Sequence, residues 1–169
     1  MRIRSACVMV AAALSATVLG VGTADATGPL SGAEVRAWAS GLVLGVASNS
    51  TVGAAQLQYQ TDTDALAQKW AIDPVTSTTF LLRNLNSDMC VTAMSGSTAD
   101  ALQQRPCDPR WEEQTFTMAG SSKPNRHLLR NLAYNKCMQQ LSSSAVPTIA
   151  VLNDCAPTNN YQAHSFDVR

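Results

Sequence analysis

The chain has 169 residues with 12 basic and 12 acidic side chains, so its formal net charge is zero. It contains no basic run or basic stripe, which argues against nucleic acid and anionic membrane surfaces as partners. The length suits one domain with a core of moderate size, for which cross-links would be a useful source of stability.

The first 26 residues have the pattern of a secretory signal peptide. Arg2 and Arg4 precede an apolar stretch over residues 6–21, and a small-x-small sequence follows at residues 24–26. The apolar stretch is shorter than the ~20 residues that a membrane span needs. We therefore predict a signal peptide over residues 1–26, cleavage near Ala26, a secreted (extracellular) protein and no membrane insertion. The mature domain would comprise residues 27–169.

The rest of the chain repeats one unit. Residues 80–85 and 127–132 share the sequence Leu-Leu-Arg-Asn-Leu after their first residue, and each is followed by two cysteines and a polar-x-aromatic triplet. A copy without cysteines comes first. The three triplets are Gln68-Lys69-Trp70, Gln114-Thr115-Phe116 and His164-Ser165-Phe166. We therefore predict three pseudo-equivalent lobes, over residues 34–75, 76–122 and 123–169.

Each lobe reads as a set of short strands. Apolar residues come in brief bursts separated by Gly, Pro, Asn, Ser and Asp, and after residue 26 no stretch keeps a helical apolar period for three turns. Three units are too few for an ordinary propeller. The predicted fold class is therefore all-β, a β-trefoil of three four-stranded lobes. Trp70, Phe116 and Phe166 are the predicted core aromatics around its axis, and Trp38 is expected in the core by its alignment with two leucines.

The cysteines predict disulfides. Removal of the signal peptide leaves four, an even number, as is usual in an exported protein. Equivalent units should form equivalent bonds, so we predict Cys90–Cys107 and Cys137–Cys155 within the second and third lobes. The rival interpretation is a zinc site. It lacks a Cys-x-x-Cys pair, and the whole chain has two histidines, so we predict no metal site.

The repeated strand, the cysteine pair and the Gln-x-aromatic triplet resemble the ricin-B-type β-trefoil lectin family over residues 34–169. This resemblance implies a non-catalytic carbohydrate-binding module with glycans or glycoproteins as partners. In that family each lobe can hold a shallow sugar pocket built from an aspartate, a glutamine, a stacking ring and an asparagine. The corresponding positions in the second lobe hold Thr92, Gln103, Arg105 and Glu113, of which Gln103 alone keeps the family residue. In the first lobe the ring position alone is kept, as Tyr59, and the third lobe matches nowhere. The sugar pockets are therefore predicted to be degenerate.

No catalytic motif occurs in the chain, so we predict that it is not an enzyme and needs no cofactor. Trp111 follows Pro-Arg in a loop, where it is either an exposed contact residue or a partly buried anchor. The repeated Arg-Asn-Leu also resembles the lectin-like subunits of cytolethal distending toxins. This resemblance implies an alternative function as a receptor-binding or docking subunit that assembles with a toxin or enzyme subunit. A protease inhibitor on the same scaffold stays open as a third alternative.

Overall fold

The protein is described by a computed structural model over residues 32–142 and 144–168. The predicted signal peptide lies outside these residues. The described part consists of short strands, as the sequence predicts, and the segments between them include four 3-10 turns. The strands are β1 (Ala33–Ala37), β2 (Val43–Val46), β3 (Leu57–Gln60), β4 (Trp70–Pro74), β5 (Thr79–Asn84), β6 (Met89–Thr92), β7 (Gln103–Pro106), β8 (Phe116–Gly120), β9 (His127–Asn131), β10 (Cys137–Gln140), β11 (Thr148–Asn153) and β12 (His164–Val168). The 3-10 turns are η1 (Ala47–Asn49), η2 (Leu66–Gln68), η3 (Glu112–Gln114) and η4 (Asn160–Gln162).

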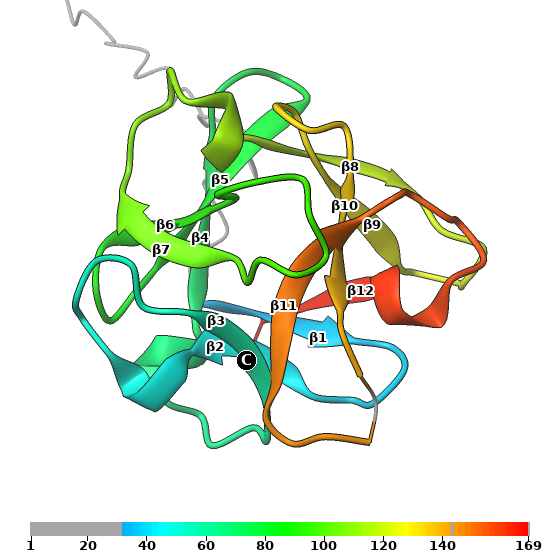
Figure 1. The fold of residues 1–169 in the computed structure, drawn as a ribbon, viewed down its shortest axis with the longest axis horizontal. Coiled ribbons are helices and arrows are strands. Elements are labelled where there is room, and N and C mark those ends of the chain that lie inside the picture. The colour runs from blue at the N-terminus through cyan, green and yellow to red at the C-terminus, as the bar shows by residue number, and fades with distance from the viewer. Residues whose placement is uncertain (1–31, 143, 169) are drawn as a thin grey trace, which may run out of the picture.

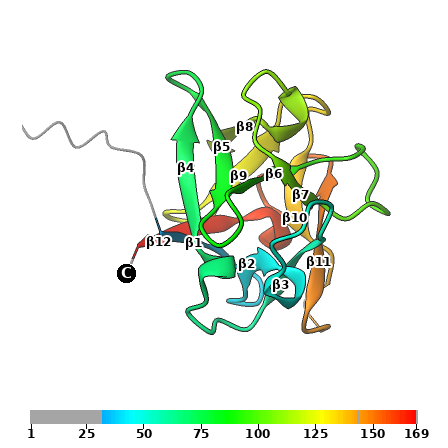
Figure 2. The ribbon, with the colours of Figure 1, turned by 90° about the vertical axis from the view of Figure 1, so that its left-hand side faces the viewer.

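Six of these strands close into a barrel. Pairing runs from β1 to β4, β5, β8, β9 and β12 and back to β1, with every neighbour antiparallel. The first and last of these strands therefore lie side by side (Figures 1 and 2). The other strands form the hairpins β2–β3, β6–β7 and β10–β11, one in each lobe. This arrangement is a β-trefoil, and the predicted fold class is confirmed.

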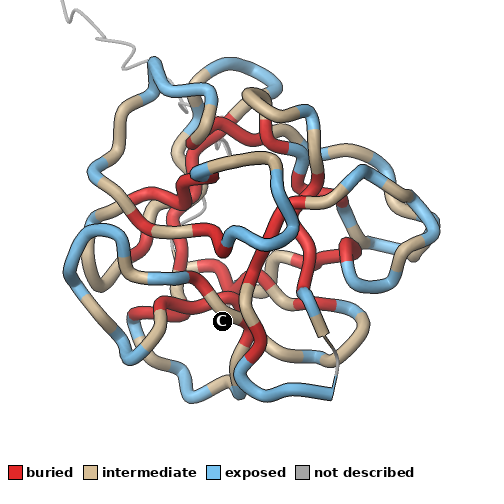
Figure 3. The backbone as a smooth tube through the Cα atoms, viewed as in Figure 1, coloured by how far each residue is buried: buried red, intermediate tan, exposed pale blue. Residues whose placement is uncertain are grey.

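The lobes meet along the trefoil axis, where the buried backbone is concentrated (Figure 3). The hairpins are linked there by hydrogen bonds from the Leu57 amide to the Leu102 carbonyl (2.8 Å) and from the Leu102 amide to the Ala150 carbonyl (2.7 Å). Alternating side chains supply the apolar filling, because successive residues of a strand face opposite sides of the sheet. In β3, Leu57 and Tyr59 are buried while the glutamines beside them are partly exposed.

The repeated Arg-Asn-Leu has a structural explanation in its asparagine. Asn84 is fully buried and donates through Nδ2 to the carbonyl of Ala67 (3.0 Å). Asn131 is also buried and donates in the same way to the carbonyl of Glu113 (2.9 Å). Each asparagine therefore satisfies a carbonyl in the 3-10 turn of the preceding lobe, where an unpaired buried group would be costly. The motif joins consecutive lobes.

The two predicted disulfides are confirmed. Cys90 bonds to Cys107 and Cys137 bonds to Cys155, in each case between the first hairpin strand of a lobe and the loop that follows the second. In the first lobe, which has no cysteines, a buried charge lies at β1. The carboxylate of Glu34 is fully buried and accepts from Arg36 (2.6 Å) and Lys69 (2.9 Å).

The third core position is occupied by a different residue from the one predicted. Trp70 pairs with Ala33 and Asn84, and Phe116 pairs with Phe80 and Asn131. The residue that pairs with the corresponding positions in the third lobe, Ala37 and His127, is His164. The structural triplet is therefore Gln162-Ala163-His164, two residues earlier than predicted.

The buried positions agree with this shift. The side chains of Trp70, Phe116 and His164 are all fully buried, whereas Phe166 is partly exposed and packs at the edge of the core. Tyr59 fills the space beside His164, and its hydroxyl lies 2.6 Å from His164 Nε2. The expectation for Trp38 is wrong as well. Its ring is 44% exposed and is covered on one face by the guanidinium of Arg126, 5.0 Å from the ring centroid.

Candidate functional site

An open hollow of about 400 Å³ lies on the second lobe. Its walls come from β6 and β7, the turn at η3 and the β9–β10 loop of the third lobe. The lining residues are Thr92, Ala93, Met94, Arg105, Trp111, Glu113 and Tyr134. This size falls within the range of small-molecule sites in proteins.

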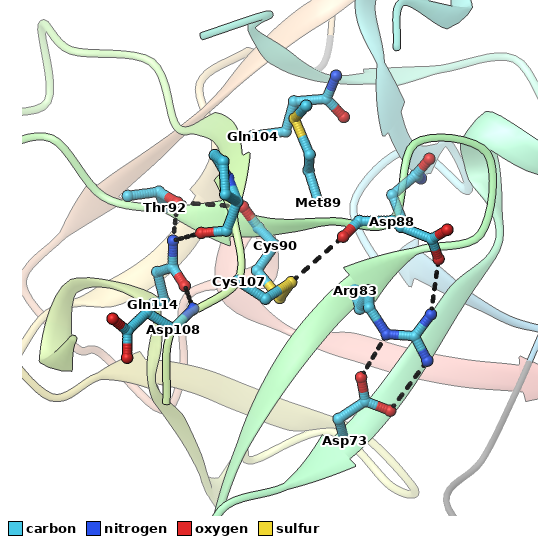
Figure 4. Close-up of a disulfide and its surroundings, with 12 residues drawn as sticks. Asp73, Arg83, Asp88, Met89, Cys90, Thr92, Gln104, Cys107, Asp108 and Gln114 are labelled. Carbon is cyan, nitrogen blue, oxygen red and sulfur yellow. Dashed lines mark hydrogen bonds and ion pairs between the residues drawn. A yellow bond between two sulfur atoms is a disulfide. The ribbon is translucent and has the colours of Figure 1, made fainter. Parts of the chain in front are cut away.

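The lining residue Thr92 is held in place by the triplet glutamine. Gln114 is fully buried, donates through Nε2 to Thr92 Oγ1 (3.0 Å) and accepts from the amide of Asp108 (2.8 Å), as Figure 4 shows. Thr92 Oγ1 donates in turn to the Cys90 carbonyl (3.0 Å). The Thr92 hydroxyl is thus engaged within the protein, with its proton already donated. It supports the site and cannot take over the two-hydroxyl acceptor role of an aspartate.

The aromatic wall is held by the turn after β7. Trp111 is 47% exposed, and its amide donates to the Asp108 carbonyl (3.0 Å). The Arg110 guanidinium donates to the Asp108 carboxylate (2.9 and 2.7 Å), which lowers the pKa of Asp108 to about 2. The disulfide at Cys107 fixes the start of this turn. These bonds hold Trp111 with one part of its ring available to a ligand.

Another wall of the hollow is formed by Tyr134 of the third lobe and Met94 of the second. The Tyr134 hydroxyl donates to the Met94 carbonyl (3.4 Å), and the Tyr134 ring lies against the backbone of Gly96. The Met94 side chain is 44% exposed. Trp111, Tyr134 and Met94 are the large apolar side chains of the hollow, and side chains of this kind suit the C–H face of a sugar ring or another flat ligand.

The polar groups of the hollow are a guanidinium and a carboxylate. Arg105 Nη2 donates to Gln103 Oε1 (3.2 Å), and its Nε lies 3.2 Å from Met94 Sδ. Glu113 is fixed through its backbone, because its carbonyl accepts from the Ala93 amide (2.9 Å). Both side chains line the hollow and remain partly exposed.

The structure therefore brings together three of the residues predicted for a sugar site, namely Thr92, Arg105 and Glu113. Gln103 lies next to them and reaches the hollow through its bond to Arg105. Sequence reasoning missed Tyr134 and Met94 and left Trp111 undecided. Tyr134 belongs to the next lobe, so no local pattern connects it with this site.

Tyr59 was expected as a stacking ring, and this expectation is wrong. Its side chain is fully buried. In the β2–β3 hairpin Gln60 lies opposite Val43, as Arg105 lies opposite Cys90 in β6–β7. Gln60 therefore holds the ring position, and the sequence alignment was off by one residue. A shift of one residue in a strand turns the side chain to the other face of the sheet.

The other lobes differ from the second at this place, and no ring side chain lines the hollow of the first lobe. The hollow of the first lobe, about 320 Å³, is lined by Ser48, Asn49, Gln60, Thr61, Thr63, Gln68, Val146 and Pro147. In the third lobe Gln139 has the position of Thr92. Its Oε1 accepts from the side chains of Asn153 (3.3 Å), Asn159 (3.2 Å) and Gln162 (3.0 Å), so this acceptor is already occupied.

Within residues 32–142 and 144–168, no group of three or more His, Cys, Asp or Glu side chains could hold a metal ion. In the same residues, no helix is long and apolar enough to cross a membrane.

The fold and the site agree with a known family. The model of the ricin-type beta-trefoil lectin domain-like family matches residues 23–105 and 66–151, so that the two matches together cover most of the chain. The chain belongs to this family. The overlap of the two matches reflects the internal repeat. No curated protein matches the chain.

Solved structures similar to this lectin-like chain share its fold at low sequence identity. The designed 3-fold symmetric protein ThreeFoil has a TM-score of 0.71 at 15% identity, covering 79% of this chain and 96% of its own. The earthworm R-type lectin C-half in complex with GalNAc has a TM-score of 0.67 at 12% identity, covering 83% of this chain and 100% of its own. The Haemophilus ducreyi cytolethal distending toxin has a TM-score of 0.65 at 15% identity, covering 79% of this chain and 80% of its own.

Proposed function

We propose that the protein is a secreted, non-catalytic carbohydrate-binding module whose working site is the hollow of the second lobe. The observation that carries this proposal is the combination of two ring side chains, a guanidinium and a carboxylate around one open hollow in a lectin-type fold. Sugars need an apolar face for stacking and fixed polar groups for their hydroxyls, and this hollow offers both. The similarity to a lectin that was solved with GalNAc supports the ligand class.

The site differs from the family pattern. The aspartate position is Thr92, whose hydroxyl is engaged, and the ring position is Arg105. Glu113 therefore supplies the acceptor and Trp111 the stacking surface. No ring side chain lines the hollow of the first lobe, and the acceptor oxygen of Gln139 in the third lobe is already occupied, so we expect one site per molecule. A single open site gains little buried area, so weak affinity is expected unless the glycan is presented on a multivalent surface.

Secretion is supported by the signal-peptide pattern over residues 1–26 and by two disulfides, which persist in oxidising compartments. A direct check is the N-terminal sequence of protein recovered from the culture medium of the native host. We expect it to begin near residue 27. Recovery from the cytoplasm with residues 1–26 intact would contradict secretion.

Carbohydrate binding is tested on a glycan array with two tryptophan variants. Trp111→Ala should lose the signal, because it removes the stacking ring from the hollow. Trp38→Ala is the matched control, since Trp38 is exposed to a similar degree, 44% against 47%, but lies outside the hollow. Equal signals from both variants would exclude the second-lobe hollow, and a wild-type protein that binds no glycan would refute the proposed function.

A second candidate function is a docking or receptor-binding subunit of a multi-chain toxin. It is supported by the shared fold with a cytolethal distending toxin and by an apolar groove of about 440 Å³ between the β4–β5 hairpin and β8. The groove contains Ile72, Phe80 and the exposed Met118. Size-exclusion chromatography of the protein from its native host distinguishes the two candidates. Co-elution with a second, different chain supports docking, and a lone species of the chain's own mass opposes it.

A further inference from the structure

Two charged side chains of the second-lobe hollow have no ionic partner among the residues that the structure describes. Arg105 contacts the neutral Gln103 Oε1 and the thioether of Met94, and Glu113 forms no ion pair. Arg83 shows the contrast, because its guanidinium pairs with Asp73 (2.6 Å) and Asp88 (2.9 Å). The hollow therefore presents one positive and one negative group that the fold leaves available.

From these two charges we infer that the second-lobe site takes a sugar that carries a carboxylate, of the hexuronic acid class. This inference rests on the proposed function and specifies its ligand. Arg105 is the group that would bind the carboxylate of the sugar. A guanidinium has five N–H donors in a planar fork, and a carboxylate can accept two of them at once. Gln103 holds one Nη2 hydrogen, which orients the fork and leaves the outer N–H groups for a ligand.

Glu113 is the negatively charged group of the hollow. Its carboxylate only accepts hydrogen bonds, so its natural partners in a sugar are hydroxyl groups. It stands near Thr92, where the family has an aspartate, and its backbone bond to Ala93 holds it there. A ligand carboxylate beside Glu113 would be repelled, because like charges at short range are unfavourable. The ligand therefore has to place its acid at Arg105 and its hydroxyls at Glu113.

A hexuronic acid has this distribution of groups. Its carboxylate is attached at one side of the pyranose ring, and vicinal hydroxyls occupy the opposite side. The C–H face between them is apolar and can lie against Trp111 or Tyr134. A neutral hexose could satisfy Glu113 and the rings in the same way, but it would offer the Arg105 charge no anion. The positive charge of Arg105 thus favours a sugar that carries a carboxylate. The negative charge of Glu113 determines which side of that sugar faces it.

The test uses one pair of ligands that differ in charge and little in shape. Trigalacturonic acid and its fully methyl-esterified form are titrated into the full chain, produced by export so that both disulfides form, and affinity is followed by calorimetry. We expect the acid to bind at least about tenfold tighter than the ester at low salt, with the advantage shrinking as salt is raised. The neutral galactose trisaccharide serves as a third ligand.

Three variants locate the effect. Arg105→Gln should abolish the preference for the acid over the ester. Arg130→Gln is the matched control, because Arg130 is an exposed arginine that donates to the neutral Asn135 Oδ1 (3.3 Å) and lies outside the hollow. Trp111→Ala should weaken both ligands by a similar factor. Unchanged unfolding midpoints show that the variants are folded.

The outcomes separate this inference from the proposed function. Equal affinity for acid and ester, or a preference for the acid that survives in Arg105→Gln, overturns the inference. If the neutral trisaccharide still binds in that case and Trp111→Ala abolishes its binding, the proposed function stands. If none of the three ligands binds and the glycan array is also blank, the inference and the proposed function fail together.

Discussion

Acidification below neutral pH should destabilise this fold through one buried histidine. His164 and Tyr59 are both fully buried, their rings stack with centroids 5.7 Å apart, and the Tyr59 hydroxyl lies 2.6 Å from His164 Nε2. Burial lowers the pKa of His164 from 6.5 to about 4, because the charged imidazolium would have to leave water. Burial also raises the pKa of Tyr59, which stays protonated throughout.

The sign of the effect follows from proton linkage. Between about pH 6.5 and pH 4 the unfolded chain protonates this histidine and the folded chain does not. The free energy of unfolding therefore falls as the pH falls, by about 1.4 kcal/mol per pH unit. The full loss is on the order of 3 kcal/mol, and below about pH 4 the contribution of His164 no longer changes. Its stabilisation is fully present above about pH 6.5.

The assay is urea unfolding at several pH values between 7 and 5, a range in which most carboxylates stay ionised. The comparison protein is the double variant Tyr59→Phe with His164→Phe. His164→Phe alone would leave the Tyr59 hydroxyl buried without an acceptor, which costs about 1–3 kcal/mol. Phenylalanine already occupies the equivalent position of the second lobe, as Phe116. The double variant should lose most of the slope between pH 6.5 and pH 5.

Two results would contradict this prediction. One is a wild-type free energy of unfolding that stays constant from pH 7 to pH 5. The other is a double variant that keeps the wild-type slope, which would assign the effect to other groups. The second histidine of the chain, His127, is exposed and is present in both proteins, so its contribution cancels in the comparison.

Three further predictions concern cross-links and charges. Replacing Cys137 and Cys155 by serine should reduce the free energy of unfolding by roughly 3 kcal/mol, because the bond closes a loop of 18 residues in the unfolded chain; an unchanged urea midpoint would contradict this. Glu34→Gln should destabilise the protein by about 1–3 kcal/mol, since its buried carboxylate accepts from two cations, and a loss below about 0.5 kcal/mol would show the network to be dispensable. The Asp108 carboxylate should titrate near pH 2 in carbon-detected NMR and move towards its ordinary 3.8 in Arg110→Gln; a value near 3.8 in the wild type would contradict the ion pair.

The repeats in the sequence were sufficient for the architecture. Three copies of one unit, two of which contain a cysteine pair, predicted three β lobes and the pairs Cys90–Cys107 and Cys137–Cys155, and the structure confirms them. They were sufficient because a repeat places equivalent residues in equivalent surroundings. Because the spacing between the two cysteines is nearly the same in both lobes, the same disulfide can form in each of them.

The sequence could not decide the register within a lobe. Tyr59 and Gln60 both fit the ring position until the pairing of Gln60 with Val43 is known. His164 and Phe166 both fit the end of a triplet until the bonds of Gln162 to the Asp154 carbonyl (2.7 Å) and the Ala156 amide (2.8 Å) are known. Loops of unequal length hide such shifts, and a shift of one residue reverses the side of the sheet on which a side chain lies.

The candidate site itself depends on tertiary structure. Thr92, Arg105 and Glu113 follow a family spacing and could be named from the sequence, but Tyr134 joins them from another lobe. That contact arises because the β9–β10 loop packs on the second lobe when the barrel closes. Patterns along a chain report which face of a strand is apolar. Which lobe supplies a neighbouring wall is decided when the lobes pack together.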